Sequence, residues 1–164
     1  MNELIEYIKV KRLHPDAVLP IRGSEGAAGY DLTAVTLEKR GDLYIYGTGL
    51  AFEIPPGYYG ALCARSSIAF QPLHKCGGVT IIDSDYRGEV FVMFRNIPRA
   101  PLWNLSIEGF LLDQGKSKSL LNAYKVGDRV AQLIIQKYTP AAFKLVDELS
   151  ETTRGPGGYG STGR

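Results

Sequence analysis

Hydrophobic and polar positions alternate with a period of two along several short stretches of the chain. These stretches are Ile5–Lys11, Leu50–Ile54 and Glu89–Phe94. Such alternation predicts β-strands that bury one face and leave the other in water. Residues Val130–Ile135 are apolar on both parities, which indicates a strand buried on both faces. No stretch has a long helical period, so we expect short helices at most, at Ser66–Gln71 and Ser117–Tyr124.

Turn residues between these stretches indicate the fold class. Pro55–Gly57 separates Leu50–Ile54 from the next strand at Tyr58–Ala64, a pattern that favours an antiparallel hairpin. Many short strands separated by glycine and proline predict an all-β sandwich or barrel. The 164 residues are enough for one domain with a single core.

Two segments depart from this rhythm. Residues 98–122 contain two prolines, Trp103 and a polar Gly-Lys-Ser-Lys stretch, and we interpret them as a long excursion between two core strands. Residues 154–164 contain five glycines, too many for the segment to hold one conformation alone. We therefore predict a domain over residues 1–153 and a mobile glycine-rich tail over residues 154–164.

Composition limits the classes of partner. The formal net charge of +2 is unlike the dense basic surface of proteins that bind polymeric nucleic acid, so we expect no nucleic-acid partner. No run approaches the roughly twenty apolar residues that cross a bilayer, and the first residues lack the apolar core of a secretory signal. We expect no membrane partner and an intracellular protein. Cys63, Cys76 and two histidines do not make a plausible zinc set.

Two motifs carry residues suited to phosphate binding and proton transfer. Arg65, Ser66 and Ser67 follow a predicted strand, where a guanidinium and two hydroxyls can hold a polyphosphate. Taken alone, these three residues are explained better by a helix N-cap beside a solvated arginine. Asp83 and Asp85 share one face if they lie on a hairpin, and a held carboxylate can accept a proton from water. A charged hairpin tip is the alternative for the two aspartates.

Three further motifs contain polar residues in unusual settings. Asp31 stands at a predicted strand start behind flexible glycines, where turn caps are common. Gln132 is an inward polar residue on a buried strand and needs a partner, for which backbone suffices. The tail offers an arginine for phosphate, an aromatic face for a base, and backbone and hydroxyl donors. These tail residues are Arg154, Tyr159, Gly160, Ser161 and Thr162.

Together these stretches resemble the five motifs of the trimeric dUTP pyrophosphatases (dUTPases). In chain order they are AGYDL, ARSS, IDSDYRGE, GDRVAQL and RGPGGYGSTG, spread over residues 26–163. The resemblance implies a jelly-roll-like β-barrel and a homotrimer whose active sites lie at subunit boundaries. It also implies Mg²⁺-dependent hydrolysis of dUTP to dUMP and pyrophosphate, which limits uracil in DNA and supplies dUMP for dTMP synthesis.

The resemblance also assigns roles to residues. It makes Asp83 the general base that activates a water for attack on the α-phosphorus, and Tyr86 the residue that packs on the deoxyribose and excludes UTP. Backbone groups ahead of Asp83 would pair with the uracil edge. Asp31 would support the water network around Mg²⁺, which phosphates and water hold without a direct protein ligand. The phosphates would be bound by Arg65, Ser66, Ser67 and Gln132. In the tail, Arg154 would reach the γ-phosphate, Tyr159 would cover the uracil, and Gly160, Ser161 and Thr162 would close over the phosphates.

The chain departs from the family pattern at three places, one of which is Tyr159, where the family usually has phenylalanine. Thr80 stands where the family usually has a glycine, with Gly77 and Gly78 displaced upstream, and the spacing from Arg65 to Asp83 is one residue longer. The excursion at residues 98–122 is longer than is typical, and a surface loop, a trimer contact or a docking site for another protein all fit it.

Two other functions remain open at this point. One is a protein with the dUTPase fold that binds other proteins and has no catalytic activity, because a fold can be kept after its catalytic function is lost. A dCTP deaminase is the other, although this chain follows its RSS motif with Ile68-Ala69-Phe70 and retains Asp85, unlike that family. The sequence does not choose among cytoplasm, nucleus and a virus-infected host cell.

Overall fold

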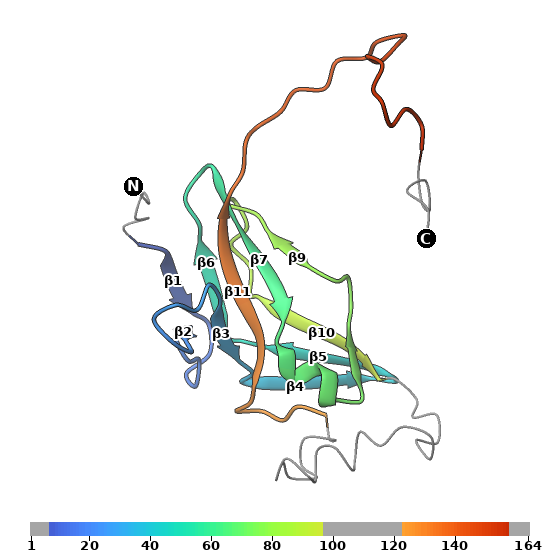
Figure 1. Ribbon diagram of the computed structural model, residues 1–164. Coiled ribbons are helices and arrows are strands. Elements are labelled where there is room, and N and C mark those ends of the chain that lie inside the picture. Colours follow the sequence, from blue (N-terminus) through green and yellow to red (C-terminus); the bar gives the residue numbers. More distant parts are fainter. Residues whose placement is uncertain (1–6, 97–122, 158–164) are drawn as a thin grey trace, which may run out of the picture.

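The computed structural model describes residues 7–96 and 123–157. Its strands form three antiparallel sheets around one hydrophobic core (Figure 1). The all-β fold expected from the sequence is confirmed. The predicted excursion at residues 98–122 lies outside the described residues, as does nearly all of the helix expected at Ser117–Tyr124.

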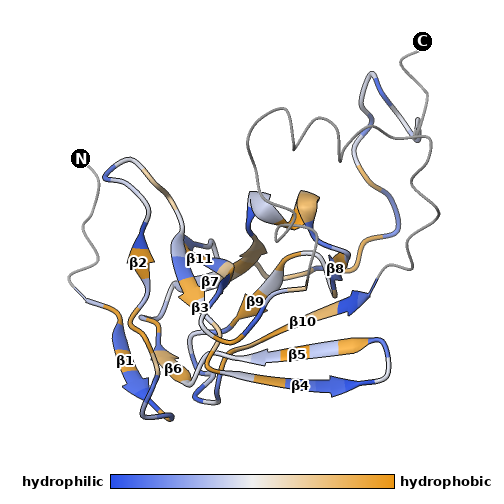
Figure 2. Cartoon of the chain, turned by 90° about the horizontal axis from the view of Figure 1, so that it is seen from below, coloured by the Kyte–Doolittle hydropathy of each residue, from blue (hydrophilic) through white to orange (hydrophobic). Residues whose placement is uncertain are grey.

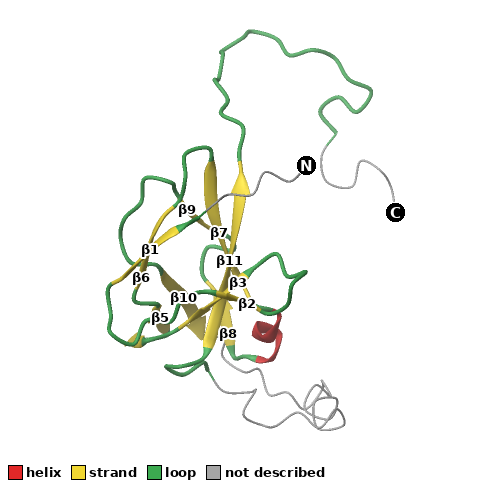
Figure 3. Ribbon diagram, turned by 90° about the vertical axis from the view of Figure 1, so that its left-hand side faces the viewer, coloured by secondary structure: helices red, strands yellow, loops and turns green. Residues whose placement is uncertain are grey.

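The largest sheet has five strands in the order β2, β3, β11, β7, β9. Their bounds are Ile21–Arg22, Tyr30–Thr33, Arg129–Lys137, Tyr58–Ala64 and Thr80–Ile82. A second sheet has the order β4 (Thr36–Arg40), β5 (Leu43–Gly47), β10 (Phe91–Asn96) and β8 (Leu73–Lys75), and a third pairs β1 (Lys9–Arg12) with β6 (Leu50–Glu53). The short helix expected after β7 is present as a 3-10 helix, η1 at Ser66–Phe70, drawn in red in Figure 3.

The alternation in the sequence matches the burial of β10 but not that of β6, in which Leu50, Ala51 and Phe52 are all buried. Along β10 buried and exposed side chains alternate, with Val92 and Phe94 in the core. The strand is apolar for most of its length and ends in hydrophilic residues (Figure 2). In β11 the side chains of Val130, Ala131 and Leu133 are buried, so both parities of this strand contribute to the interior, as the sequence predicts.

The hairpin predicted across Pro55–Gly57 is wrong. β6 pairs with β1, whereas β7 pairs with β11 and β9, so the turn carries the chain from one sheet to another. The turn itself is present, with a hydrogen bond from the Tyr58 amide to the Pro55 carbonyl at 3.2 Å and a φ of 84° at Gly57. A turn signal fixes where the chain reverses, but the edges that offer unpaired backbone groups decide which strands pair.

The Asp83 segment also lies in a connection between sheets, not at a hairpin tip. β9 pairs with β7, and β10 pairs with β5 and β8. The residues between β9 and β10 make a tight turn closed by the Tyr86 amide, which donates to the Asp83 carbonyl at 3.2 Å. The guanidinium of Arg87 donates to two backbone carbonyls of this turn, those of Ser84 and Tyr86.

The chain leaves the barrel after Lys137 as an extended segment, residues 138–157, which we call the C-terminal arm (Figures 1 and 3). Three apolar side chains on it, Phe143, Leu145 and Leu149, are almost completely exposed. Exposed apolar side chains in such a row are unfavourable in water unless another surface covers them.

Candidate functional site

Three of the five motifs meet at one end of the five-stranded sheet. Gln132 of β11 is paired with Asp31 of β3 on one side and with Cys63 of β7 on the other. β7 ends one residue after Cys63, and Arg65 follows at the same edge. The central position of β11 therefore brings together the AGYDL, ARSS and GDRVAQL motifs.

The carboxylate of Asp31 binds two guanidinium groups. Its Oδ1 accepts a hydrogen bond from Arg65 Nε at 2.8 Å, and its Oδ2 accepts one from Arg129 Nη1 at 3.0 Å. Arg65 Nη1 also donates to the Arg129 carbonyl at 3.1 Å. We call Asp31, Arg65 and Arg129 the arginine cluster. Two cations face one anion, so the cluster carries a net positive charge.

This cluster is partly shielded from water, which strengthens its attraction for anions. The Asp31 side chain is 11% exposed and the Arg65 side chain 24% exposed. Charge–charge interactions are screened less in such a setting than on the open surface. The sequence did not single out Arg129, although it lies inside the GDRVAQL motif. The turned-in Asp31 that holds it could not be foreseen without the pairing of β3 with β11.

Gln132 depends on a glycine of another motif. Its Nε2 donates to the Ala64 carbonyl at 3.1 Å, so backbone satisfies the amide nitrogen. A Cβ at Gly29 would lie 2.7 Å from the Gln132 Oε1 and 3.2 Å from its Cδ. Carbon and oxygen atoms do not approach so closely without repulsion. The absence of a side chain at Gly29 therefore leaves the space that Gln132 occupies.

The two serines of the ARSS motif differ in environment. Ser66 is exposed at the start of η1. The Ser67 hydroxyl lies 2.9 Å from the Tyr124 hydroxyl, and Tyr124 is buried in the core. Burial raises the pKa of the Tyr124 phenol, so this group stays protonated and can donate a hydrogen bond. Tyr124 in turn packs edge-on against Tyr46, which links the serine to the centre of the core.

Asp83 lies at the other end of the sheet, in a shallow pocket of about 630 Å³. The pairing of Gly60 with Ile82 places Asp83 beside the start of β7. The pocket is lined by Tyr58, Tyr59, Ile81, Asp83, Ser84, Asp85 and Tyr138. Asp83 and Asp85 thus face the same pocket although no hairpin joins them.

Tyr86 folds back over a glycine of its own motif. The Tyr86 hydroxyl donates to the Glu89 carbonyl at 3.0 Å, and 43% of the residue is exposed. A Cβ at Gly88 would lie 2.4 Å from the Tyr86 oxygen, so only glycine permits this ring position. The ring is held at one end and open to a ligand along its exposed face.

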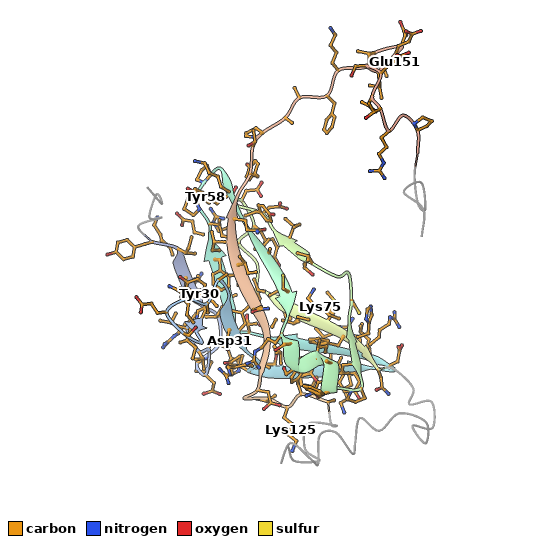
Figure 4. All side chains as sticks on the ribbon, in the orientation of Figure 1. Tyr30, Asp31, Tyr58, Lys75, Lys125 and Glu151 are labelled. Carbon is orange, nitrogen blue, oxygen red and sulfur yellow. The ribbon has the colours of Figure 1, made fainter. Side chains whose placement is uncertain are left out.

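The two groups of site residues are far apart within one chain. Ile82 is paired with Gly60, so Asp83 lies near Tyr59, six residues before Arg65 along the same strand. At about 3.3 Å per residue this is a separation of about 20 Å. Asp31 and Tyr58 accordingly appear at opposite ends of the barrel in Figure 4. One chain therefore does not bring Asp83 to the arginine cluster.

The tail residues are described only in part. Arg154 is exposed on the C-terminal arm, and its Nε donates to the Gly157 carbonyl at 3.0 Å. Tyr159, Gly160, Ser161 and Thr162 lie outside the described residues.

Within residues 7–96 and 123–157, no three or more His, Cys, Asp or Glu side chains are grouped closely enough to bind a metal ion. No helix in the same residues has the length and hydrophobicity that crossing a bilayer requires.

Comparison with known proteins identifies the family. The sequence model of dUTPase matches residues 16–102 and 121–163, which is most of the chain and includes all five motifs. The chain belongs to the dUTPase family. Membership confirms the resemblance inferred from the motifs and the class of enzyme it implied, a nucleotide hydrolase.

Relatives at the family level come from distant organisms. The mitochondrial deoxyuridine 5′-triphosphate nucleotidohydrolase of Dictyostelium discoideum is 40% identical, over 96% of this chain and 78% of its own. The enzyme of the same name from Paramecium bursaria Chlorella virus 1 is 37% identical, over 94% of this chain and 96% of its own. Among solved structures, a variant of the Staphylococcus bacteriophage 80alpha dUTPase with dUpNHpp is 25% identical and superposes with a TM-score of 0.76, over 97% of this chain and 99% of that one.

Proposed function

We propose that this dUTPase family member hydrolyses dUTP to dUMP and pyrophosphate, with water attacking the α-phosphorus. The observation that carries the proposal is the division of the motif residues into two sets with complementary chemistry. One set is the positive arginine cluster with Gln132, and the other is the Asp83 pocket together with Tyr86, which lies on the same turn as Asp83 and is half-exposed. The names of the relatives and the analogue dUpNHpp in the phage structure support the same substrate.

The site forms between chains in this proposal. A general base must lie within hydrogen-bond reach of the water it activates, and the groups that bind the phosphates must lie close to that water. The separation of about 20 Å along β7 prevents this within one chain. A homotrimer with cyclic symmetry brings the Asp83 pocket of one subunit to the arginine cluster of the next, three times over.

The C-terminal arm supports assembly as well. Its exposed Phe143, Leu145 and Leu149 need a surface to cover them, and a neighbouring subunit supplies one. The arm also carries Arg154 away from its own barrel (Figure 1). We therefore place Arg154, Tyr159, Gly160, Ser161 and Thr162 over a site on another subunit. There the tail, residues 154–164, closes over the nucleotide and excludes bulk water.

Two residues act at the reacting end and the sugar. Asp83 accepts a proton from the attacking water, because its carboxylate is open to the pocket and held in place by the turn that follows β9. Tyr86 packs on the deoxyribose with its exposed ring face, where a 2′-hydroxyl has no room. Nucleotides with ribose are then rejected by contact with the ring.

The phosphates are bound by Arg65, Ser66, Ser67 and Gln132 in the proposal. Asp31 orients Arg65 by accepting from its Nε, which fixes the plane of the guanidinium fork. Because a second arginine shares the same carboxylate, the cluster keeps its net charge for the ligand. Positioning of the reacting groups and neutralisation of phosphate charge account for most of the reduction in activation free energy by such an enzyme.

Mg²⁺ is the cofactor we propose, because a triphosphate chain offers this small hard cation the oxygen ligands it prefers. Both carboxylate oxygens of Asp31 already accept from arginines, so Asp31 acts on the ion through water and not as a direct ligand. When bound, the ion neutralises charge that develops on the phosphates. The role in the cell is to limit uracil incorporation into DNA and to supply dUMP for dTMP synthesis, which is an intracellular task.

The test is pyrophosphate release by the purified protein with Mg²⁺, with dUTP, dCTP, dTTP and UTP offered in parallel and EDTA as a control. We expect turnover of dUTP alone, abolished by EDTA. Ammonia release from dCTP would instead establish a deaminase. No turnover of any nucleotide by the folded protein would contradict the proposal and favour a non-catalytic interaction protein, with residues 98–122 as the first place to look for its docking site.

A further inference from the structure

A lysine points into the interior next to the turn that joins β8 to β9. Lys75 is the last residue of β8 and is 5% exposed, whereas the neighbouring His74 is exposed. Among the residues that the structure describes, no other charged residue is buried. A buried ammonium loses its hydration, and this desolvation lowers the pKa of Lys75, although the nearby Cys63 and Cys76 thiols act in the opposite direction. Such an unfavourable placement needs compensation from specific contacts.

The compensation comes entirely from the turn that follows. The Lys75 Nζ donates to the Gly78 carbonyl and to the Thr80 Oγ1, both at 2.8 Å, and at 3.4 Å to the Cys76 carbonyl. An ammonium has three donors, so these oxygens match its capacity. No carboxylate forms an ion pair with Lys75 in the described structure. The lysine thus binds the turn at residues 76–80 along its whole length.

This turn has an unusual backbone that the lysine stabilises. Gly77 and Gly78 follow one another with φ values of 72° and 58°, a left-handed conformation that costs other residues energy. The turn leads directly into β9, whose Ile81 lines the Asp83 pocket. Thr80, which stands in place of the family's usual glycine, provides one of the oxygens that Lys75 binds. The departure from the family pattern and the buried lysine are therefore parts of one arrangement.

We propose that Lys75 is a specificity-determining positioning residue, whose ammonium fixes the turn at residues 76–80 so that the backbone leading to Asp83 accepts uracil and rejects cytosine. This inference rests on the proposed function. Uracil presents a carbonyl where cytosine presents an amine, so a base-reading segment favours uracil when it has few free acceptors. Lys75 directs the oxygens of Cys76, Gly78 and Thr80 toward its own buried Nζ, which turns these acceptors away from the base and leaves the amine of cytosine without partners. Unpaired polar groups at a buried base edge are what makes such rejection strong.

The experiment compares four variants with the wild type in kcat and KM for dUTP and dCTP, together with the thermal midpoint. Lys75→Met keeps the length of the side chain and removes the ammonium. Thr80→Val removes one acceptor at constant shape, and Thr80→Ser is its matched control because it keeps the hydroxyl. Lys11→Met is the control for loss of a lysine charge, since Lys11 is exposed on β1.

Lys75→Met is expected to raise the KM for dUTP and to narrow the preference for dUTP over dCTP by about tenfold, with kcat changed by less than about threefold. Thr80→Val should shift both quantities in the same direction by a smaller factor, whereas Thr80→Ser and Lys11→Met should match the wild type. If Lys75→Met does not fold, the Thr80 pair still decides.

Two results would overturn the inference in distinguishable ways. A lower thermal midpoint with unchanged KM and unchanged dUTP preference, in Lys75→Met or in Thr80→Val, would show that the lysine only stabilises the fold. A wild type that hydrolyses no dUTP would overturn the proposed function itself, and the inference with it.

Discussion

The contact between Gly29 and Gln132 allows the site to be tested without changing any residue that binds substrate. Gly29→Ala adds one Cβ, 2.7 Å from the Gln132 Oε1 and 3.2 Å from its Cβ and Cδ. The atom under most pressure is the end of a flexible side chain, so Gln132 can rotate away while the backbone stays in place. We expect this rotation to break the hydrogen bond from Gln132 Nε2 to the Ala64 carbonyl.

The expected effect on stability is small because two terms oppose each other. Loss of the hydrogen bond costs about 1 kcal/mol. Replacing glycine by alanine restricts the unfolded chain and restores about 0.4–1 kcal/mol. Gly29 does not have a positive φ, so no backbone strain is added. The free energy of unfolding should therefore change by less than about 1 kcal/mol, while misplacement of Gln132 lowers kcat/KM for dUTP by about tenfold.

The assay is steady-state dUTP hydrolysis, with urea unfolding as the measure of stability. Gly26→Ala is the matched control, because a Cβ there has nothing within 4 Å. A double-mutant cycle with Gln132→Ala isolates the mechanism, since Gly29→Ala should add no further loss once the long side chain is gone. Full activity of Gly29→Ala, or an undiminished loss in the Gln132→Ala background, would refute the reasoning.

Four further predictions concern the proposed site and the core. Asp83→Asn should retain nucleotide binding by calorimetry but lose turnover by about 10²-fold or more, and near-normal turnover would remove Asp83 from the role of base. Asp83→Asn chains mixed with Arg65→Ala chains should recover about a quarter of wild-type activity if subunits associate at random and each site takes these two residues from different chains, whereas activity no higher than that of the two parents would show that each chain holds its own site. A chain that ends before Arg154 should stay folded by circular dichroism with little activity, whereas full activity would exclude closure by the tail. Tyr46→Phe should lower the free energy of unfolding by about 1 kcal/mol through loss of its hydrogen bond to the Tyr124 carbonyl, and an unchanged urea midpoint would count against that bond.

The sequence predicted an all-β fold and the five motifs that contain the candidate site residues. Period-two alternation marks β10 because a strand between core and water must alternate its side chains. The candidate site residues could be picked out because each chemical task needs particular side chains. A phosphate site requires guanidinium and hydroxyl groups, and a proton acceptor requires a carboxylate, so the residue types made Arg65 and Asp83 candidates, whereas the resemblance to the five dUTPase motifs gave them their expected roles.

Only the tertiary structure decided which residues meet. The turn at Pro55–Gly57 gave no information on pairing, since β6 pairs with β1, which lies near the N-terminus and not next to the turn. Arg129 and Gly29 lie next to the candidate site residues because β11 lies between β3 and β7. This order of strands cannot be predicted from any local sequence pattern. The same sheet separates Asp83 from Arg65, and the inward direction of Lys75 follows from its register on β8. Local chemistry determines what each residue can do, whereas long-range pairing determines which other residues it can act with.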